Sequence, residues 1–288
     1  MIVAGAAVQG TGHLAAGRGC QDAFKAADLG DAVVLAVADG AGSRERSALG
    51  AHIAVDAACR VLAEGIPDAR DAPETWTRWA AAGGARLVAE YLGAAAAVLR
   101  ATGGGQPPSD GPAPDAGALA ATVAAAVVRP PWVAFVSVGD CFGTVLTQGA
   151  ARPGPAMEAA RTGLAPETAA ERCHLVLPPA VPGGPGPVFL SSPGAALRVR
   201  SFVVWEPELS GVVLATDGCT ALSLDHPAAH GLPPEAGPVP SERFFCGLAA
   251  TLRANGGDAE PLRALLSGPE AARTGDDLTV LCAVLDGR

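Results

Sequence analysis

Four aspartates lie at the ends of strongly apolar segments. VLAVADG (34–40) and VLATDG (213–218) each run through apolar residues to an Asp-Gly pair, and VAFVSVGD (133–140) ends at a third aspartate. TGDDLTVLCAVL (274–285) is the reverse case, in which aspartates lead into an apolar segment. A single Asp-Gly pair is an ordinary turn signal and needs no ligand. Four aspartates in the same setting favour a shared site instead, formed by Asp39, Asp140, Asp217 and Asp276.

The chemistry that suits such a site is the binding of a hard divalent cation. Mg²⁺ and Mn²⁺ prefer oxygen ligands, and Mg²⁺ keeps several waters while it takes only a few carboxylates. A glycine after the aspartate lets the chain turn sharply and expose its carbonyl to an ion. The pattern therefore predicts a Mg²⁺ or Mn²⁺ site at the strand ends.

The ordered set of motifs resembles a known family. QDAF, VADGAGS, VGDCFGT, ATDG and GDDLTVL follow one another as in the metal-dependent protein serine/threonine phosphatases, the type 2C or PPM family, and especially its divergent bacterial branch. The resemblance runs from about Gly12 to Val284. It implies an α+β fold, a four-layer αββα sandwich of two antiparallel sheets flanked by helix pairs, with a binuclear Mn²⁺ or Mg²⁺ site at one end.

The resemblance also implies roles for individual residues. Asp39 would bridge the two ions, the Gly40 carbonyl would bind one of them, and Asp217 and Asp276 would ligate the other. Asp39, Asp217 and Asp276 would thus be the catalytic residues, because the paired ions activate a water that hydrolyses the phosphate ester without a phosphoenzyme.

Two further acidic positions match the family. Asp22 would support the cluster through water, and Asp140 together with Asp217 would form a third, weaker metal site. In GDDL the first aspartate, Asp276, occupies the ligand position of the family, so it ranks above Asp277.

Three positions depart from the family pattern. Gln21 stands where a glutamate is usual, which removes a negative charge beside the metals. Ala41 stands where animal members have a histidine thought to protonate the leaving group, although many bacterial members lack it too. Gly17 stands at the usual place of the phosphate-binding arginine, so the adjacent Arg18 is the candidate for that role.

These departures leave three functions open. The first is a protein phosphatase acting on phosphoserine or phosphothreonine, with a phosphorylated protein as its partner and a cognate kinase as a further expectation. The second is a regulatory or binding module that keeps the fold but has lost efficient turnover. The third is a phosphatase for a small phosphorylated metabolite.

The elements that must position these residues alternate in groups. Strands are expected at residues 2–9, 32–38, 119–128, 132–138, 142–148, 198–205, 211–216 and 278–285. Ala-rich segments predict helices at residues 47–64, 74–100, 241–254 and 258–267. Three consecutive strands joined by short links within 119–148 must be antiparallel, so an α+β sandwich is expected rather than a doubly wound sheet.

Residues 1–288 are expected to form a single domain. Pro/Gly-rich segments at 103–117, 178–187 and 226–240 are interpreted as surface loops, because the motifs on either side of them complete one site. Ser43 or Ser47 is expected to cap the helix that follows the first Asp-Gly. His13 and His52 are expected to be structural, since neither has a partner in a motif.

Charge and cysteine content restrict the partners and the compartment. The net charge is −9 and the basic residues are scattered, so nucleic acid is not expected as a partner. No uninterrupted apolar stretch is long enough to predict a membrane span. The seven cysteines are odd in number and form no CxxC pair, which predicts a reduced, cytoplasmic protein. Cys20, Cys141 and Cys219 lie within two residues of proposed ligands and are interpreted as packing residues.

Overall fold

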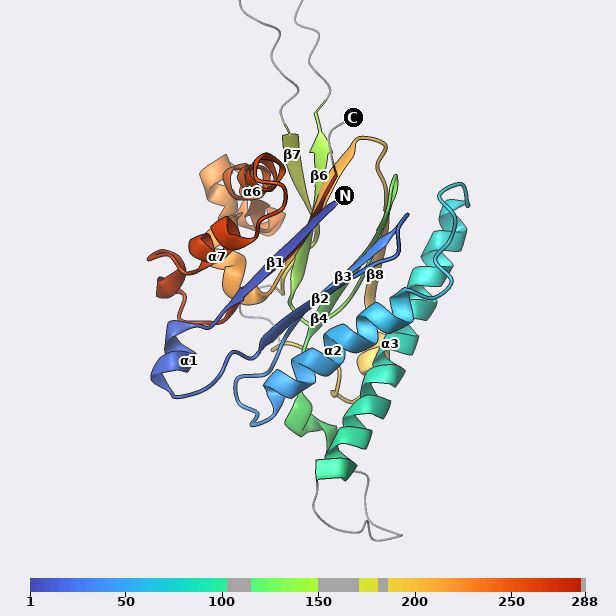
Figure 1. Cartoon of the computed structure of the whole chain (residues 1–288), viewed down its shortest axis with the longest axis vertical. Helices are drawn as coiled ribbons and strands as arrows, with labels where there is room; N and C mark the ends of the chain where they lie inside the picture. Colours follow the sequence, from blue (N-terminus) through green and yellow to red (C-terminus); the bar gives the residue numbers. More distant parts are fainter. Residues whose placement is uncertain (103–114, 150–170, 181–185, 286–288) are drawn as a thin grey trace, which may run out of the picture.

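The computed structural model describes residues 1–102, 115–149, 171–180 and 186–285, which form two five-stranded antiparallel sheets (Figure 1). The first sheet has the order β1 (Ile2–Val8), β12 (Leu278–Val284), β9 (Leu209–Ala215), β6 (Phe142–Gln148) and β7 (Glu171–Leu177). The second sheet has the order β2 (Asp22–Asp28), β3 (Val33–Asp39), β4 (Val123–Arg129), β5 (Trp132–Val138) and β8 (Arg200–Trp205).

Helices cover the outer face of each sheet. Helices α2 (Ser47–Leu62) and α3 (Pro73–Thr102) pack on the second sheet, whereas α6 (Glu242–Ala254) and α7 (Glu260–Leu266) lie against the first (Figure 1). The short helices α1 (Thr11–Ala15) and α5 (Thr220–Ser223) follow β1 and β9, and β10 (Leu224–Asp225) pairs with β11 (Val239–Pro240). These layers confirm the predicted αββα sandwich.

The side chains of a central strand alternate between two hydrophobic cores, one between the sheets and one beneath the helices. Val33, Leu35 and Val37 of β3 point into the core between the sheets. Val34 and Ala36 point to the other side, into the core beneath α2 and α3. Because successive side chains of a strand face opposite ways, a central strand of this sandwich must be apolar at every position.

In the two five-stranded sheets, the strands that the sequence did not predict are edge strands. β2 and β7 were not predicted, and each lies at the edge of its sheet. β2 exposes Phe24, Lys25 and Ala26, so its sequence lacks the apolar run of a central strand. β4 begins at Val123, later than predicted, because residues 116–119 form a 3-10 turn that the Asp115 side chain caps.

The predicted loops have mixed outcomes. Residues 103–114 and 181–185 lie outside the described residues. The segment 226–240 contains two short 3-10 turns and ends in β11, so it is more structured than predicted. The two sheets share one core between them, which is what a single domain requires, and the domain extent itself stays a prediction.

The predicted serine cap of α2 is wrong. Arg46 occupies the N-cap position, and no side chain caps the helix there. Ser47 is fully buried, and its hydroxyl donates to the Arg44 carbonyl at 3.0 Å.

Helix α3 is the one described helix that is long and apolar enough, by length and composition alone, to cross a membrane. One side of the helix is buried, because it packs against α2, β5 and β8. Trp76 is fully buried and stacks on Trp132 of β5, with 5.6 Å between ring centroids. The core helix of a soluble protein meets the same criterion, and the absence of membrane partners stays a prediction.

Candidate metal centre

Two of the predicted ligands lie directly opposite each other on neighbouring strands. Asp22 begins β2, Asp39 ends β3, and the register pairs them across the edge of the second sheet. Like charges in such a pair are unfavourable, and burial adds to the cost. Burial, together with the charges of Asp22 and Asp217, raises the pKa of Asp39 to about 10. Burial likewise raises the pKa of Asp22 to about 7.

A hydrogen-bond chain from the first sheet holds Asp22. The Thr216 hydroxyl, at the end of β9, donates to Asp22 Oδ2 at 2.7 Å, and the Thr279 N–H of β12 donates to Thr216 Oγ1 at 3.0 Å. Thr216 was not among the predicted site residues, although its place immediately before Asp217 was a usable signal. This threonine fixes an acidic side chain of one sheet from the other.

Asp217 and Asp276 approach the pair from the first sheet. Asp217 opens a 3-10 turn after β9, and Asp276 lies in the turn that leads into β12. The two turns touch at Gly218, where an added Cβ would lie 2.0 Å from the Asp277 carbonyl oxygen and 3.4 Å from the Asp276 Cβ. Burial, followed by the charges of Asp140 and Asp276, raises the pKa of Asp217 to about 6.

Asp140 lies on the connection between the two sheets, just after β5 and before β6. It is buried, and its Oδ1 has no hydrogen-bond partner among the described residues. Burial raises its pKa, while Arg200 opposes the shift and Asp276 adds to it. Electrostatic interactions link the five aspartates in a series: Asp22 acts on Asp39, Asp217 and Asp276 also act on Asp39, and Asp140 acts on Asp217.

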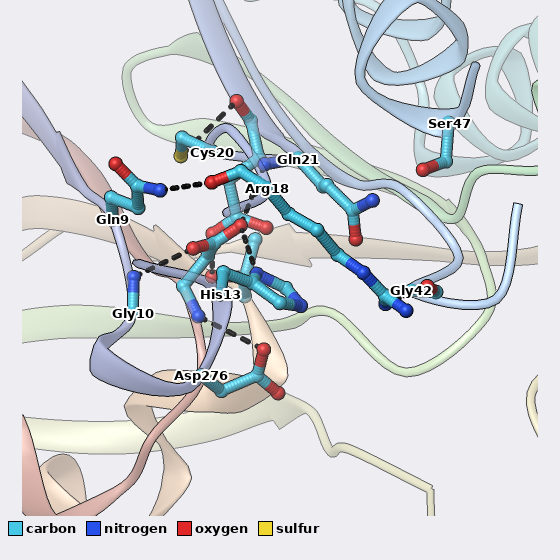
Figure 2. A network of polar contacts seen from close by, with 12 residues as sticks. Gln9, Gly10, His13, Arg18, Cys20, Gln21, Gly42, Ser47 and Asp276 are labelled. Atoms are coloured by element: carbon cyan, nitrogen blue, oxygen red, sulfur yellow. Dashed lines mark hydrogen bonds and ion pairs between the residues drawn. The ribbon is translucent and has the colours of Figure 1, made fainter. Parts of the chain in front are cut away.

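The two neighbouring aspartates of GDDL differ in burial and in hydrogen bonding. Asp277 is buried, and its carboxylate accepts the Gly10 N–H at 2.7 Å and the Gln21 N–H at 2.6 Å. Asp276 is exposed and accepts the Asp277 N–H at 2.9 Å (Figure 2). Because the oxygens of Asp277 are used by backbone donors, Asp276 is the one with oxygens to offer a cation.

Among the described residues, the Arg18 side chain makes no ion pair with the proposed ligands. Its guanidinium donates to the Gly42 carbonyl (Figure 2). Arg18, Gln21, Gly42 and Arg44 are among the residues lining a pocket of about 340 Å³. The pocket adjoins the turn that carries Asp39 and Gly40, and the phosphate-binding role of Arg18 stays a prediction.

The expectation that His13 has no partner is wrong. His13 Nδ1 lies 2.9 Å from Asp277 Oδ2. His52, by contrast, is exposed on α2, as a surface residue would be. The partner of His13 could not be seen in the sequence, because 264 positions separate His13 from Asp277.

Residues 9–267 match the family model described as protein phosphatase 2C. The chain belongs to this family. No curated protein matches the sequence closely enough to be called a relative.

Solved structures of similar fold cover nearly the whole chain. Serine/threonine phosphatase Stp1 from Staphylococcus aureus is 12% identical, with a TM-score of 0.56 over 100% of this chain and 96% of that chain. Serine-threonine phosphatase 2C from Toxoplasma gondii is 14% identical, with a TM-score of 0.56 over 99% of this chain and 94% of that chain. At these identities the likeness establishes the fold.

The side chains of this phosphatase 2C chain fit hard divalent cations. Within the described residues, no three His, Cys, Asp or Glu side chains already form a set that could hold a metal ion. The donors are nevertheless carboxylates, they raise one another's pKa values, and the buried Asp140 Oδ1 lacks a partner among the described residues. A cation bound partly through water would suit the carboxylates, offset their mutual repulsion and give the Asp140 oxygen a partner.

The cysteines near the centre are packing residues in this fold. Cys141 and Cys219 are fully buried, and burial raises the pKa of both thiols. Cys20 is partly buried, and burial raises the pKa of its thiol to about 12. A thiol with a raised pKa is a poor nucleophile at neutral pH.

Proposed function

We propose that this protein is a Mn²⁺- or Mg²⁺-dependent phosphatase that hydrolyses phosphoserine and phosphothreonine in proteins. The observation that carries the proposal is the gathering of Asp22 and Asp39 from one sheet with Asp217 and Asp276 from the other. Membership of the phosphatase 2C family supports the phosphatase activity. The phosphorylated protein partner, a cognate kinase and the cytoplasmic location are parts of the same proposal.

The roles proposed for the ligands follow from their positions. Asp39, whose pKa responds to Asp22, Asp217 and Asp276, would contact both ions, with the Gly40 carbonyl beside it. Asp217 and Asp276 would hold the second ion, and Asp140 with Asp217 a third. When bound, such ions lower the pKa of a coordinated water and neutralise phosphate charge. Arg18 would orient the phosphate from the pocket wall.

The direct test is hydrolysis by the purified chain. With Mn²⁺ present, it should release phosphate from a phosphothreonine peptide and from p-nitrophenyl phosphate, and a chelator should stop both reactions. Absence of turnover on both substrates would contradict the proposal.

The Asp39→Asn variant should abolish this activity, because it removes the charge shared between the ions. Asp56→Asn is the matched control, since Asp56 is a half-exposed aspartate on α2 that pairs with Lys25. Phosphate release should fall to background in the first variant and stay at the wild-type rate in the second.

One feature favours the alternative of a binding module. Gln21 is buried and neutral, and its Oε1 has no hydrogen-bond partner among the described residues. If calorimetry detects negligible Mn²⁺ binding, the module becomes the better account. If two ions bind but only small phosphorylated metabolites are hydrolysed in a substrate panel, a metabolite phosphatase becomes the better account.

A further inference from the structure

His13 has a fixed orientation because its partner carboxylate is itself fixed. The side chain of Asp277 is 1% exposed, and that of His13 is 17% exposed. The Gly10 and Gln21 N–H groups hold both oxygens of Asp277. His13 Nδ1 lies 2.9 Å from Asp277 Oδ2, an ion-pair distance, without the geometry of a hydrogen bond. At this distance the carboxylate would repel a lone pair on Nδ1, so Nδ1 is the ring nitrogen that carries the proton. Nε2 is therefore the ring nitrogen left to act elsewhere.

Nε2 of His13 lies close to Gly42, one of the residues that line the Arg18 pocket. A Cβ built on Gly42 would lie 3.7 Å from His13 Nε2 and 3.6 Å from Gln21 Oε1. Gly42 lines the pocket, and its carbonyl accepts from Arg18. Figure 2 shows the Arg18 side chain running past His13 to Gly42. An imidazole nitrogen, a guanidinium and an amide oxygen that has no partner in the described part of the chain thus lie close to one glycine.

We propose that His13 donates a proton to the leaving oxygen of the phosphate ester, with Asp277 as its positioning residue. This inference rests on the proposed phosphatase function and adds a catalytic residue to it. The oxygen of water bonds to phosphorus and gives up one proton to solvent, the ester P–O bond breaks with its electron pair on the leaving oxygen, and the Nε2 proton passes to that oxygen. Solvent then returns a proton to Nε2. A histidine held by a carboxylate at Nδ1 is suited to this task.

The competing explanation is that His13 only anchors α1 to Asp277. His13→Asn separates the two roles, because the asparagine Nδ2 can take the place of His13 Nδ1 while nothing replaces Nε2. His52→Asn is the matched control, since His52 is an exposed histidine on α2. Thermal melts of both variants check that the fold is retained.

The decisive measurement compares esters with poor and good leaving groups. On a phosphothreonine peptide and on phenyl phosphate, kcat/KM of His13→Asn should fall about 100-fold or more, the usual scale of general acid catalysis. On 2,4-dinitrophenyl phosphate, whose leaving oxygen needs no proton, it should stay within roughly threefold of wild type. His52→Asn should match wild type on all three.

Each other outcome has a definite meaning. An equal loss on all three esters, or no loss on any, would overturn the role of His13 while the phosphatase function stands. A wild-type protein inert on all three would overturn the proposed function, and His13 with it.

A second readout needs neither metal nor turnover. In the metal-free protein, ¹⁵N NMR of the neutral imidazole should show His13 protonated at Nδ1, with its signals assigned by their loss in His13→Asn. Protonation at Nε2 alone would mean that Asp277 does not hold the ring, and would overturn the proposal.

Discussion

At the scale of single residues, the candidate centre is a region of unfavourable charge. Asp22 and Asp39 face each other across two strands, and burial raises both of their pKa values. A fold selected for stability alone would not place acids in this way. The folded, metal-free protein therefore holds protons that the unfolded chain releases.

This charge makes the stability of the metal-free protein depend on pH. The favourable contribution of the three acids is fully present below their unfolded pKa near 3.8. It is lost as pH rises through about 6 for Asp217, about 7 for Asp22 and toward about 10 for Asp39. In a chelator, Asp39→Asn should melt at a higher temperature than wild type at pH 8, and the difference should shrink at pH 5. Thermal melts at the two pH values measure this, and an Asp39→Asn variant no more stable at pH 8 would contradict the charge argument.

The adjacent aspartates offer a sharper contrast. Asp277→Ala should destabilise the metal-free protein by about 1–3 kcal/mol for each of the two backbone N–H groups left without an acceptor. Asp276→Asn keeps an oxygen that accepts the Asp277 N–H, so it should weaken Mn²⁺ binding and leave the free energy of unfolding of the metal-free protein unchanged or higher. Urea unfolding with chelator measures the stability of both variants, and calorimetry measures their Mn²⁺ binding. If the Asp277 variant lost Mn²⁺ binding and the Asp276 variant lost stability, Asp277 would be the ligand and Asp276 the structural residue.

The sequence could predict which acids lie at strand ends, because Asp-Gly after an apolar run is a local signal. It could not predict that Asp277 holds Gly10, Gln21 and His13. Those contacts join opposite ends of the chain, and no periodicity or spacing encodes them.

At the scale of secondary structure, close approach between turns sets the geometry of the centre. The turn after β9 and the turn before β12 touch at Gly218, where any side chain would meet the Asp277 carbonyl. Central strands such as β3 and β9 were predictable, since both of their faces are buried. Edge strands β2 and β7 were not, because exposed positions interrupt their apolar pattern.

Gly218→Ala should therefore impair metal binding and stability together. The added Cβ would lie 2.0 Å from a backbone oxygen, so one of the two turns must move. Gly247→Ala is the control: Gly247 is an exposed residue of α6, and its added Cβ would meet nothing within 4 Å. The control should gain up to about 1 kcal/mol from helix propensity. Calorimetric Mn²⁺ titration and thermal melts measure both, and normal Mn²⁺ affinity in Gly218→Ala would contradict the expectation.

At the scale of the whole molecule, the proposed ligands come from both sheets. Asp22 and Asp39 belong to the second sheet, Asp217 and Asp276 to turns of the first, and Asp140 to the connection between them. An ion held by this set would join the two halves of the sandwich at one end.

Mn²⁺ should accordingly raise the melting temperature of the wild-type protein. A cation at 100 times its Kd stabilises the folded state by about 2.7 kcal/mol per independent site. Asp39→Asn should lose most of this response, and Ca²⁺ or Mg²⁺ titrations would rank the ions. A melting temperature indifferent to Mn²⁺ at millimolar concentration would contradict an ion that joins the sheets.

The pairing of β1 with β12 has a consequence for protein engineering. Ile2 lies opposite Val284, so the first and last strands of the described chain are hydrogen-bonded neighbours. A short glycine-serine tether could join the two ends without disturbing either sheet. The backbone could then be reopened at the exposed β2–β3 hairpin around Gly30, giving a circularly permuted protein in which every proposed ligand keeps its neighbouring strand.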